Sequence, residues 1–145
     1  MRRSEALASL SRDHHHGLVV AQRLRRATGE SAADARAAFL DFWHHDGNLH
    51  FRVEEEVLLP RVAARVAPTD DAVVRVLTEH VEIRRRADAL ERSGPAVDAQ
   101  HELGAMLHDH IRHEERVLFP RIEAALSDEE LSDLAVAVEA AHDAG

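Results

Sequence analysis

The amino-acid sequence predicts an all-α fold, an antiparallel up-down bundle of four long helices followed by a short fifth helix at the C-terminus. Apolar residues recur at alternating three- and four-residue steps along each long segment, and short Gly- or Pro-containing breaks separate these segments. The apolar residues are largely Ala, Val and Leu, and aromatic residues make up only 3%. This composition favours helix over a strand-rich fold, and the short connections favour antiparallel neighbours.

The first helix is expected over residues 4–27, with Ser4 as its N-cap and Gly29 as its stop. His14 lies on the same stripe as the apolar residues of this helix. A His that points where apolar side chains point is unusual, so His14 is a candidate site residue.

The second helix is expected over residues 31–66 and is closed by Pro68. Within it, Pro60 should bend the helix or loosen its last turns. Gly47 and Asn48 mark a second place where the helix could be interrupted.

The third helix is expected to begin at Thr69 or Asp70 and to end at Gly94, which is followed by Pro. His80 lies on its apolar face. The fourth helix is expected over residues 96–126. We therefore expect the core bundle to occupy about residues 4–126.

The fifth helix, over about residues 127–144, is expected to pack across an end or a side of the bundle. Ser127 and Glu130 have the spacing of a capping box and mark its start. A chain of 145 residues suits one domain with one core, so residues 1–145 are interpreted as a single domain.

Charge and composition exclude several classes of function. The formal net charge of −9 argues against nucleic acid or an anionic membrane as a partner, and the Arg runs at 23–26 and 84–86 are interpreted as solvated helix faces. The absence of Cys excludes disulfides, iron–sulfur clusters and thiolate zinc sites. No run approaches the roughly 20 apolar residues of a membrane span, and the N-terminus lacks the apolar core of a signal peptide. The expected location is therefore cytoplasmic.

The sequence contains an internal repeat. The segment HFRVEEEVLLPRV at residues 50–62 recurs as HIRHEERVLFPRI at residues 110–122, with identical spacing. The first and third helices match more weakly, through an acidic residue followed by His at positions 13–14 and 79–80. We therefore expect two similar helical hairpins that face each other, each with a His on one helix and a His-x-x-x-Glu on the next.

This pattern predicts a metal site. A His and a Glu at i and i+4 share one helix face, so two such pairs beside two further histidines place six potential ligands in a narrow space. Four neutral imidazoles and two carboxylates suit two divalent first-row metals rather than calcium or magnesium, which prefer oxygen. The candidate ligands are His14, His50, Glu54, His80, His110 and Glu114.

Two solvated helix faces that happen to resemble each other are the alternative. It is disfavoured because the same stripes carry apolar residues, among which unpaired carboxylates are costly to bury. On the first helix, His15 is the alternative to His14.

The residues around these ligands leave several roles open. Glu55 and Glu115 directly follow candidate ligands, turned about 100° around the helix, and are expected to support the site or lie at the surface rather than bind metal. Asp46 could form a hydrogen bond at the site entrance or simply stand at a helix end. Arg84 could pair with a carboxylate near the centre or reach solvent.

The succession of His, His-x-x-x-Glu, His and His-x-x-x-Glu, with Val-Leu-x-Pro shortly after each Glu pair, resembles the HHE cation-binding branch of the hemerythrin-like family. The resemblance extends to about Leu126. It implies an up-down four-helix bundle around two iron ions with an oxo or hydroxo bridge, iron being favoured over zinc or manganese. The six candidate residues would be the ligands.

The resemblance also implies a small-molecule ligand: oxygen, nitric oxide or hydrogen peroxide. A catalase-like or peroxidase-like activity is one form this could take, so whether the chain is an enzyme stays open. The alternative is an iron- or redox-responsive sensor or interaction module without turnover, with the fifth helix as its reporter.

The sequence departs from the oxygen-carrying hemerythrins of invertebrates in two places. Their third helix supplies two histidines one turn apart, but the residue four after His80 is Arg84. Their fourth helix supplies a His and an Asp five residues later, whereas Glu114 follows His110 by four. With one His fewer and no Tyr to replace it, reversible oxygen carriage is disfavoured.

Overall fold

The computed structural model describes residues 3–145, so the expectations that fall on Met1 and Arg2 lie outside the described residues. Within residues 3–145 the chain is helical and contains no strand, which confirms the all-α prediction. The elements in chain order are α1 (Glu5–Arg25), α2 (Ala32–Phe42), η1 (Trp43–Gly47), α3 (Asn48–Val53), η2 (Glu54–Leu58), α4 (Leu59–Val62), α5 (Asp71–Ser93), α6 (Val97–His113), η3 (Glu114–Leu118), α7 (Phe119–Ala125) and α8 (Asp128–Ala144).

The η elements are π-helical turns inside two long continuous helices, one from α2 to α4 and one from α6 to α7. Two of these turns directly precede the segments that carry Pro60 and Pro120. Proline has no N–H and its ring collides with the carbonyl four residues earlier in a regular helix, so a wider turn lets the helix continue past it. The expected disturbance at Pro60 is therefore a π-turn, and the expected interruption near Gly47 is the π-turn η1.

The expected helix bounds hold within a few residues, with one clear exception. The second long helix ends at Val62 rather than at Val66. The backbone N–H groups of Arg65 and Val66 both bond to the Val62 carbonyl, so the chain closes a turn there, and the Val66 side chain is buried. The chain thus leaves the helix at Val62 while the Val66 side chain stays in the core.

Two helix starts follow from capping side chains. Asp70 accepts a hydrogen bond from the N–H of Ala72 and is the N-cap of α5, which decides between the two expected starts. Ser127 and Glu130 form the expected capping box at the start of α8.

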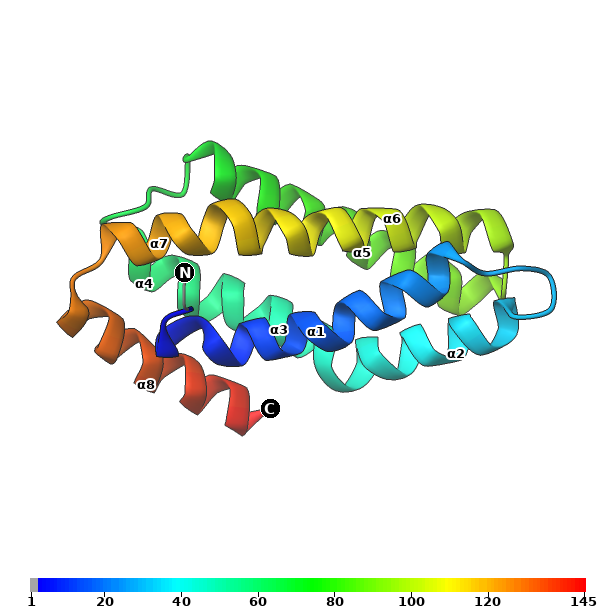
Figure 1. Ribbon diagram of the computed structural model, residues 1–145, viewed down its shortest axis with the longest axis horizontal. Helices are drawn as coiled ribbons and strands as arrows, with labels where there is room; N and C mark the ends of the chain where they lie inside the picture. Colours follow the sequence, from blue (N-terminus) through cyan, green and yellow to red (C-terminus); the bar gives the residue numbers. More distant parts are fainter. Residues whose placement is uncertain (1–2) are drawn as a thin grey trace.

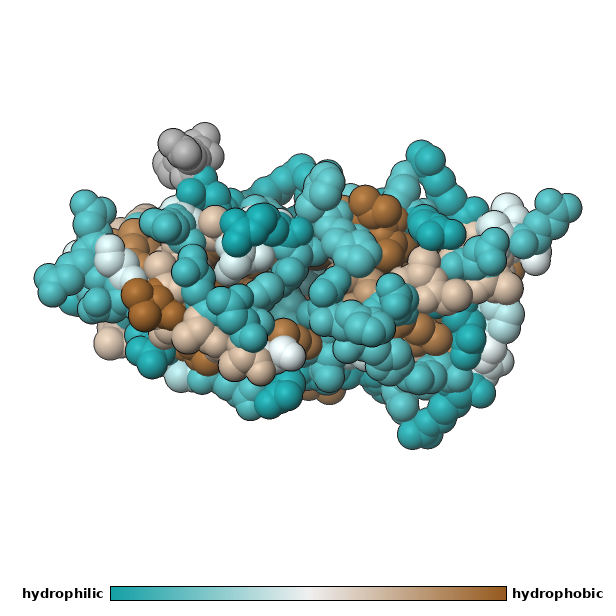
Figure 2. Space-filling view, turned by 90° about the horizontal axis from the view of Figure 1, so that it is seen from below, coloured by the Kyte–Doolittle hydropathy of each residue, from teal (hydrophilic) through white to brown (hydrophobic). Residues whose placement is uncertain are grey.

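The long helices lie lengthwise beside one another, and α8 lies against the end of the molecule where α1 begins (Figure 1). Helix α1 packs along α6 and α2, and α5 packs along α6. Helix α8 packs on α1, α3 and η2, with Leu134 and Val138 buried. The face of the molecule shown in Figure 2 is mostly hydrophilic, with apolar side chains in small separate patches. Among the helices of residues 3–145, none has the length and apolarity needed to cross a membrane.

Two apolar cores lie on either side of a polar layer. One contains Leu7 and Leu10 from α1 together with Val73 and Val76 from α5. The other contains residues further along the same helices, among them Leu24. The candidate histidines of α1 and α5 fall between the two sets, so the fold places the predicted site in the middle of the bundle.

Candidate metal centre

The structure brings all six predicted site residues together in the bundle interior, and each is at most 4% exposed. Their ligand atoms form two groups, within each of which they lie at most 4.8 Å from one another. Both groups contain Glu54 and Glu114. The first site comprises His14, His50, Glu54 and Glu114, and the second site comprises Glu54, His80, His110 and Glu114.

Each of the two carboxylates faces one His from each site. Oε1 of Glu114 lies 3.4 Å from Nε2 of His14 and 2.8 Å from Nε2 of His110. Two ligands bound at about 2.1 Å and at right angles to each other are about 3.0 Å apart. The spacing around Glu114 therefore suits ligands that share an ion.

Glu54 repeats this arrangement in the other hairpin. Its Oε2 lies 3.4 Å from Nε2 of His50 and its Oε1 lies 3.1 Å from Nε2 of His80. Each carboxylate thus faces one His of each site, Glu114 through Oε1 alone and Glu54 through both oxygens, so either could hold two ions together.

The inner polar atoms have no hydrogen-bond partner among the described residues. These are the Nε2 atoms of the four histidines and both carboxylate oxygens of Glu54 and Glu114. Leaving a buried polar group unsatisfied costs about 1–3 kcal/mol, so a cluster of such atoms requires a bound ion, or protons held between its members. Nitrogen and carboxylate oxygen donors at this spacing fit a pair of divalent transition-metal ions.

A carboxylate outside the cluster fixes each inner His. Each Nδ1 donates to one carboxylate oxygen, so each Nε2 lone pair is directed at the centre. This is the arrangement by which proteins orient metal-binding histidines. The pairs are His14 with Glu115 at 2.6 Å, His50 with Asp13 at 3.0 Å, His80 with Glu55 at 2.6 Å and His110 with Glu79 at 2.9 Å.

These four outer carboxylates follow the internal repeat. Asp13 and Glu79 each directly precede a candidate ligand and bind the His of the next helix in the same hairpin. Glu55 and Glu115 each directly follow a candidate ligand and bind a His of the opposite hairpin. Sequence reasoning missed the roles of Asp13 and Glu79, although the acidic residue before each His was the signal that could have found them.

The structure also shows where the residues lie whose roles the sequence left open. His14 is buried and faces the cluster, whereas His15 is exposed. Arg84 pairs with Glu55 at 2.7 Å rather than extending freely into solvent. Asp46 pairs with the exposed His16 at 3.0 Å.

The pKa values show how the charges are distributed when no metal is bound. Burial, together with the neighbouring Glu114 carboxylate, raises the pKa of Glu54 from 4.5 to about 8. Burial lowers the pKa of His110, but the nearby carboxylates, Glu114 first, outweigh it and raise this pKa from 6.5 to about 10. Burial likewise raises the pKa of Glu114, and the charge of His110 more than offsets it and holds this pKa well below 4.5. A proton on Glu54 and a charge on His110 thus take the place of metal charge.

The outer carboxylates remain ionised. Burial raises the pKa of each, but hydrogen bonds from the histidines and from neighbouring groups bring the net pKa of Asp13, Glu55, Glu79 and Glu115 below its usual value. Ionised carboxylates are the acceptors that the Nδ1–H groups require.

A small apolar cavity lies beside the cluster. Its walls include Phe42, Phe51, Leu107 and Ile111, and its lining also includes His110 and three of the four residues of the first site. It leaves about 10 Å³ for the centre of a water-sized molecule, which is about room for one water. The cavity therefore borders the first site with mostly apolar walls.

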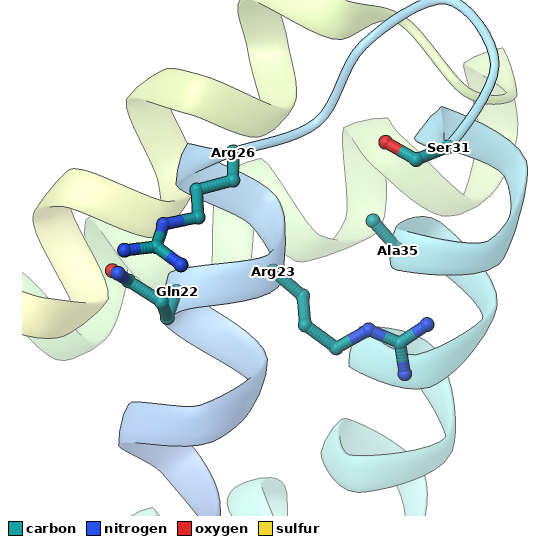
Figure 3. A pocket seen from close by; sticks show the side chains of 5 residues that line it. All are labelled: Gln22, Arg23, Arg26, Ser31 and Ala35. Carbon is teal, nitrogen blue, oxygen red and sulfur yellow. The ribbon is translucent and has the colours of Figure 1, made fainter.

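A separate surface pocket lies between the end of α1 and the start of α2, and it contains none of the six site residues (Figure 3). Arg26 lies beside Gln22, and Arg23 extends away from them toward α2. Its lining, with Ser31 and Ala35, offers no carboxylate or imidazole, so this pocket has no part in metal binding.

Comparison with known proteins gives one match. The family model of the hemerythrin HHE cation-binding domain matches residues 5–122, which is well over half of the chain and includes all six site residues. No curated protein and no solved structure matches the chain. The extent of the family match shows that the chain belongs to the hemerythrin HHE cation-binding domain family.

Proposed function

We propose that this protein holds two iron ions between its helices and binds or reacts with oxygen, nitric oxide or hydrogen peroxide. The observation that carries the proposal is the pair of buried sites that share Glu54 and Glu114 and leave their donor atoms unsatisfied. Cation binding is the property of the family, and imidazole with bridging carboxylate favours first-row transition metals. Two neighbouring iron ions can share the electrons needed to bind or cleave an O–O bond.

The number of donors leaves room for a small ligand. Each site offers two imidazole nitrogens and two shared carboxylates, which is fewer than the six positions of an octahedral ion. The cavity beside the first site is bordered by Phe42 and Ile111. These side chains exclude bulk water and admit a molecule of about the size of water.

The chain's own residues have distinct roles in this proposal. The four histidines and two glutamates would hold the ions, and an oxo or hydroxo group would bridge them. The four outer carboxylates keep the histidines in the tautomer that binds metal. A catalase-like or peroxidase-like reaction is the enzymatic form of this proposal.

Metal analysis and absorption spectroscopy test the proposal. Protein purified without added metal is expected to contain about two iron ions per chain and to show the bands of a bridged ferric pair. Rapid mixing of the reduced protein with oxygen, nitric oxide and peroxide should change the spectrum with at least one of them. Zinc or manganese in place of iron, or inertness towards all three ligands, would contradict it.

Glu54→Gln is the matched variant, because it removes a carboxylate that would bridge while keeping the volume. It is expected to lower the metal content, whereas Glu56→Gln, an exposed neighbour that pairs with Arg52, should keep both ions. Equal metal content in the two variants would argue against a bridging role.

A second candidate is an iron- or redox-responsive sensor or interaction module without turnover. The observation that favours it is the packing of α8 on α1 and α3, the helices that carry His14 and His50. Metal binding stabilises the state that binds it, so proteolysis of α8 should differ between metal-free and metal-loaded protein. Identical cleavage would count against this function.

We further propose that residues 1–145 form one domain in the cytoplasm, with an antiparallel up-down core at about 4–126. The short connections at alternating ends of the long helices support this order (Figure 1). The net charge of −9 supports a small molecule rather than nucleic acid or a membrane as the partner.

A further inference from the structure

We propose that His142 on α8 is a positioning residue for the first site, so that docking of α8 and metal occupancy of that site are coupled. The inference rests on the proposed metal function and adds a means of regulating one of the two sites.

The geometry is a chain of three side chains. Nε2 of His142 donates to Oδ2 of Asp13 at 2.9 Å, and the same oxygen accepts from Nδ1 of His50 at 3.0 Å. Nε2 of His50 faces the first site. Asp13 therefore orients His50, a residue of the first site. Asp13 is itself held by His142, which lies 129 positions further along the chain.

The position of His142 depends on the packing of α8. Val138, one turn earlier on the same face, is fully buried, and Leu134 is 3% exposed. Helix α8 contacts α1, α3 and η2, the elements that carry His14, His50 and Glu54. Residues 128–144 lie beyond the part that matches the family model, and α8 packs mainly on the first hairpin.

Among residues 3–145, the second site has no such connection to a separate helix. The residue equivalent to Asp13 is Glu79, which binds His110. Its other partner is Arg75, one turn away on the same helix and half exposed. The two sites are thus alike in their inner ligands, but only the first depends on a separate helix.

The coupling must act in both directions. If a docked α8 helps to orient His50, a metal ion bound by His50 must favour the docked state of α8 by the same factor. Removing a partner that orients a metal-binding His costs about 10- to 100-fold in metal affinity. His142 acts on His50 only through Asp13, so we expect the metal affinity of the first site to fall by about 10-fold or less.

Two substitutions separate the hydrogen bond from the packing. His142→Leu keeps a side chain against α1 but removes the donor, whereas His142→Gln retains an N–H donor. Glu139→Gln, at an exposed position of the same helix, is the surface control. Metal affinity is measured on the full chain by anaerobic Fe²⁺ titration against a competing chelator, and α8 docking by hydrogen exchange of its backbone amides.

In the unaltered chain we expect two bound ions and greater protection of α8 on metal loading. His142→Leu should weaken one ion by up to about 10-fold, leave the other unchanged and abolish the metal-dependent protection. His142→Gln should restore most of both effects, and Glu139→Gln should change neither.

Other results overturn the inference. If His142→Leu keeps both metal affinities and the metal-dependent protection of α8, docking of α8 and metal binding are not coupled through His142. Equal weakening of both ions, or the same loss with Gln as with Leu, would mean a general packing effect instead. These results leave the proposed metal function standing, whereas failure of the unaltered chain to bind any metal would overturn both.

Discussion

The tautomer of each inner histidine is set by a carboxylate rather than by the metal. Hydrogen bonds of 2.6–3.0 Å from Nδ1 to ionised carboxylates place the proton on the outer nitrogen and leave Nε2 free to bind an ion. Without these partners, a buried imidazole could rotate, or could carry its proton on Nε2 instead of Nδ1. The imidazole rings are therefore oriented before a metal arrives, and His110 must give up the proton on its Nε2 when an ion binds.

The first-helix ligand can be tested by exchanging neighbours. His14→Ala removes a buried imidazole that faces Glu114, and metal content is expected to fall from about two ions to about one per chain. His15→Ala changes an exposed side chain and should leave metal content unchanged. Elemental analysis measures both, and a loss of metal with His15→Ala alone would assign the ligand to His15.

The apolar cavity makes a separate prediction about ligand access. Ile111→Phe places a larger side chain where about 10 Å³ is open, and overpacking costs about 1–3 kcal/mol. We expect binding of nitric oxide to the reduced protein to slow by about tenfold or more, with metal content unchanged. Val117→Phe, on the same long helix but 36% exposed, is the control. Equal rates in the two variants would place the route elsewhere.

At the level of residues, the sequence predicted the inner cluster better than its surroundings. The repeated His-x-x-x-Glu and the apolar stripes were enough to indicate that the six residues converge. Which His each outer carboxylate would bind could not be predicted, because Glu55 and Glu115 cross to the other hairpin. Spacing along one helix says nothing about which residue of a neighbouring helix lies opposite.

At the level of elements, strong periodicity with Gly and Pro breaks predicted the long helices to within a few residues. The π-turns were not predicted, since a proline in a helical pattern is equally compatible with a bend, a frayed end or a wider turn. The contact of His142 with Asp13 was also beyond prediction, because it depends on how α8 docks on α1. That docking arises from tertiary packing of Leu134 and Val138.

The capping box of α8 gives a test at this level. Ser127→Ala removes the acceptor for the Glu130 N–H and should cost about 1 kcal/mol. Because α8 is the last helix, we expect faster hydrogen exchange and proteolysis of its first turns before any change elsewhere. Ser132→Ala, at an exposed position inside the same helix, should be neutral or slightly stabilising. Equal protection of α8 in both variants would contradict a role for the cap.

The whole molecule is two apolar cores with a layer of charge between them. The two cores flank a polar layer whose inner atoms lack hydrogen-bond partners among the described residues. The apolar cores must therefore offset the cost of this layer in the metal-free chain. Metal binding removes that cost, and stability should consequently depend on both metal and pH.

The sign of the pH dependence follows from the raised pKa values. Folding raises the pKa of Glu54 from 4.5 to about 8 and that of His110 from 6.5 to about 10. The folded metal-free chain thus holds protons that the unfolded chain has released. This stabilisation is fully present below the unfolded pKa of each group and is lost as pH rises through the folded pKa. The depressed pKa of Glu114 contributes stability above about pH 4.5, and this contribution is lost only as pH falls below that value.

We therefore expect the free energy of unfolding of metal-free protein to fall between about pH 4.5 and pH 10, by about 1.4 kcal/mol per pH unit for each proton involved. Metal binding needs an ionised Glu54 and a neutral His110, so the stabilisation by metal should grow over the same range. Denaturant unfolding with and without metal measures both trends. Glu54→Gln should remove the metal-free slope up to about pH 6.5 and make it shallower from there to about pH 8, because the amide takes up no proton while His110 still does. If the free energy of unfolding of the metal-free protein stays level or rises over this range, Glu54 and His110 do not take up protons on folding.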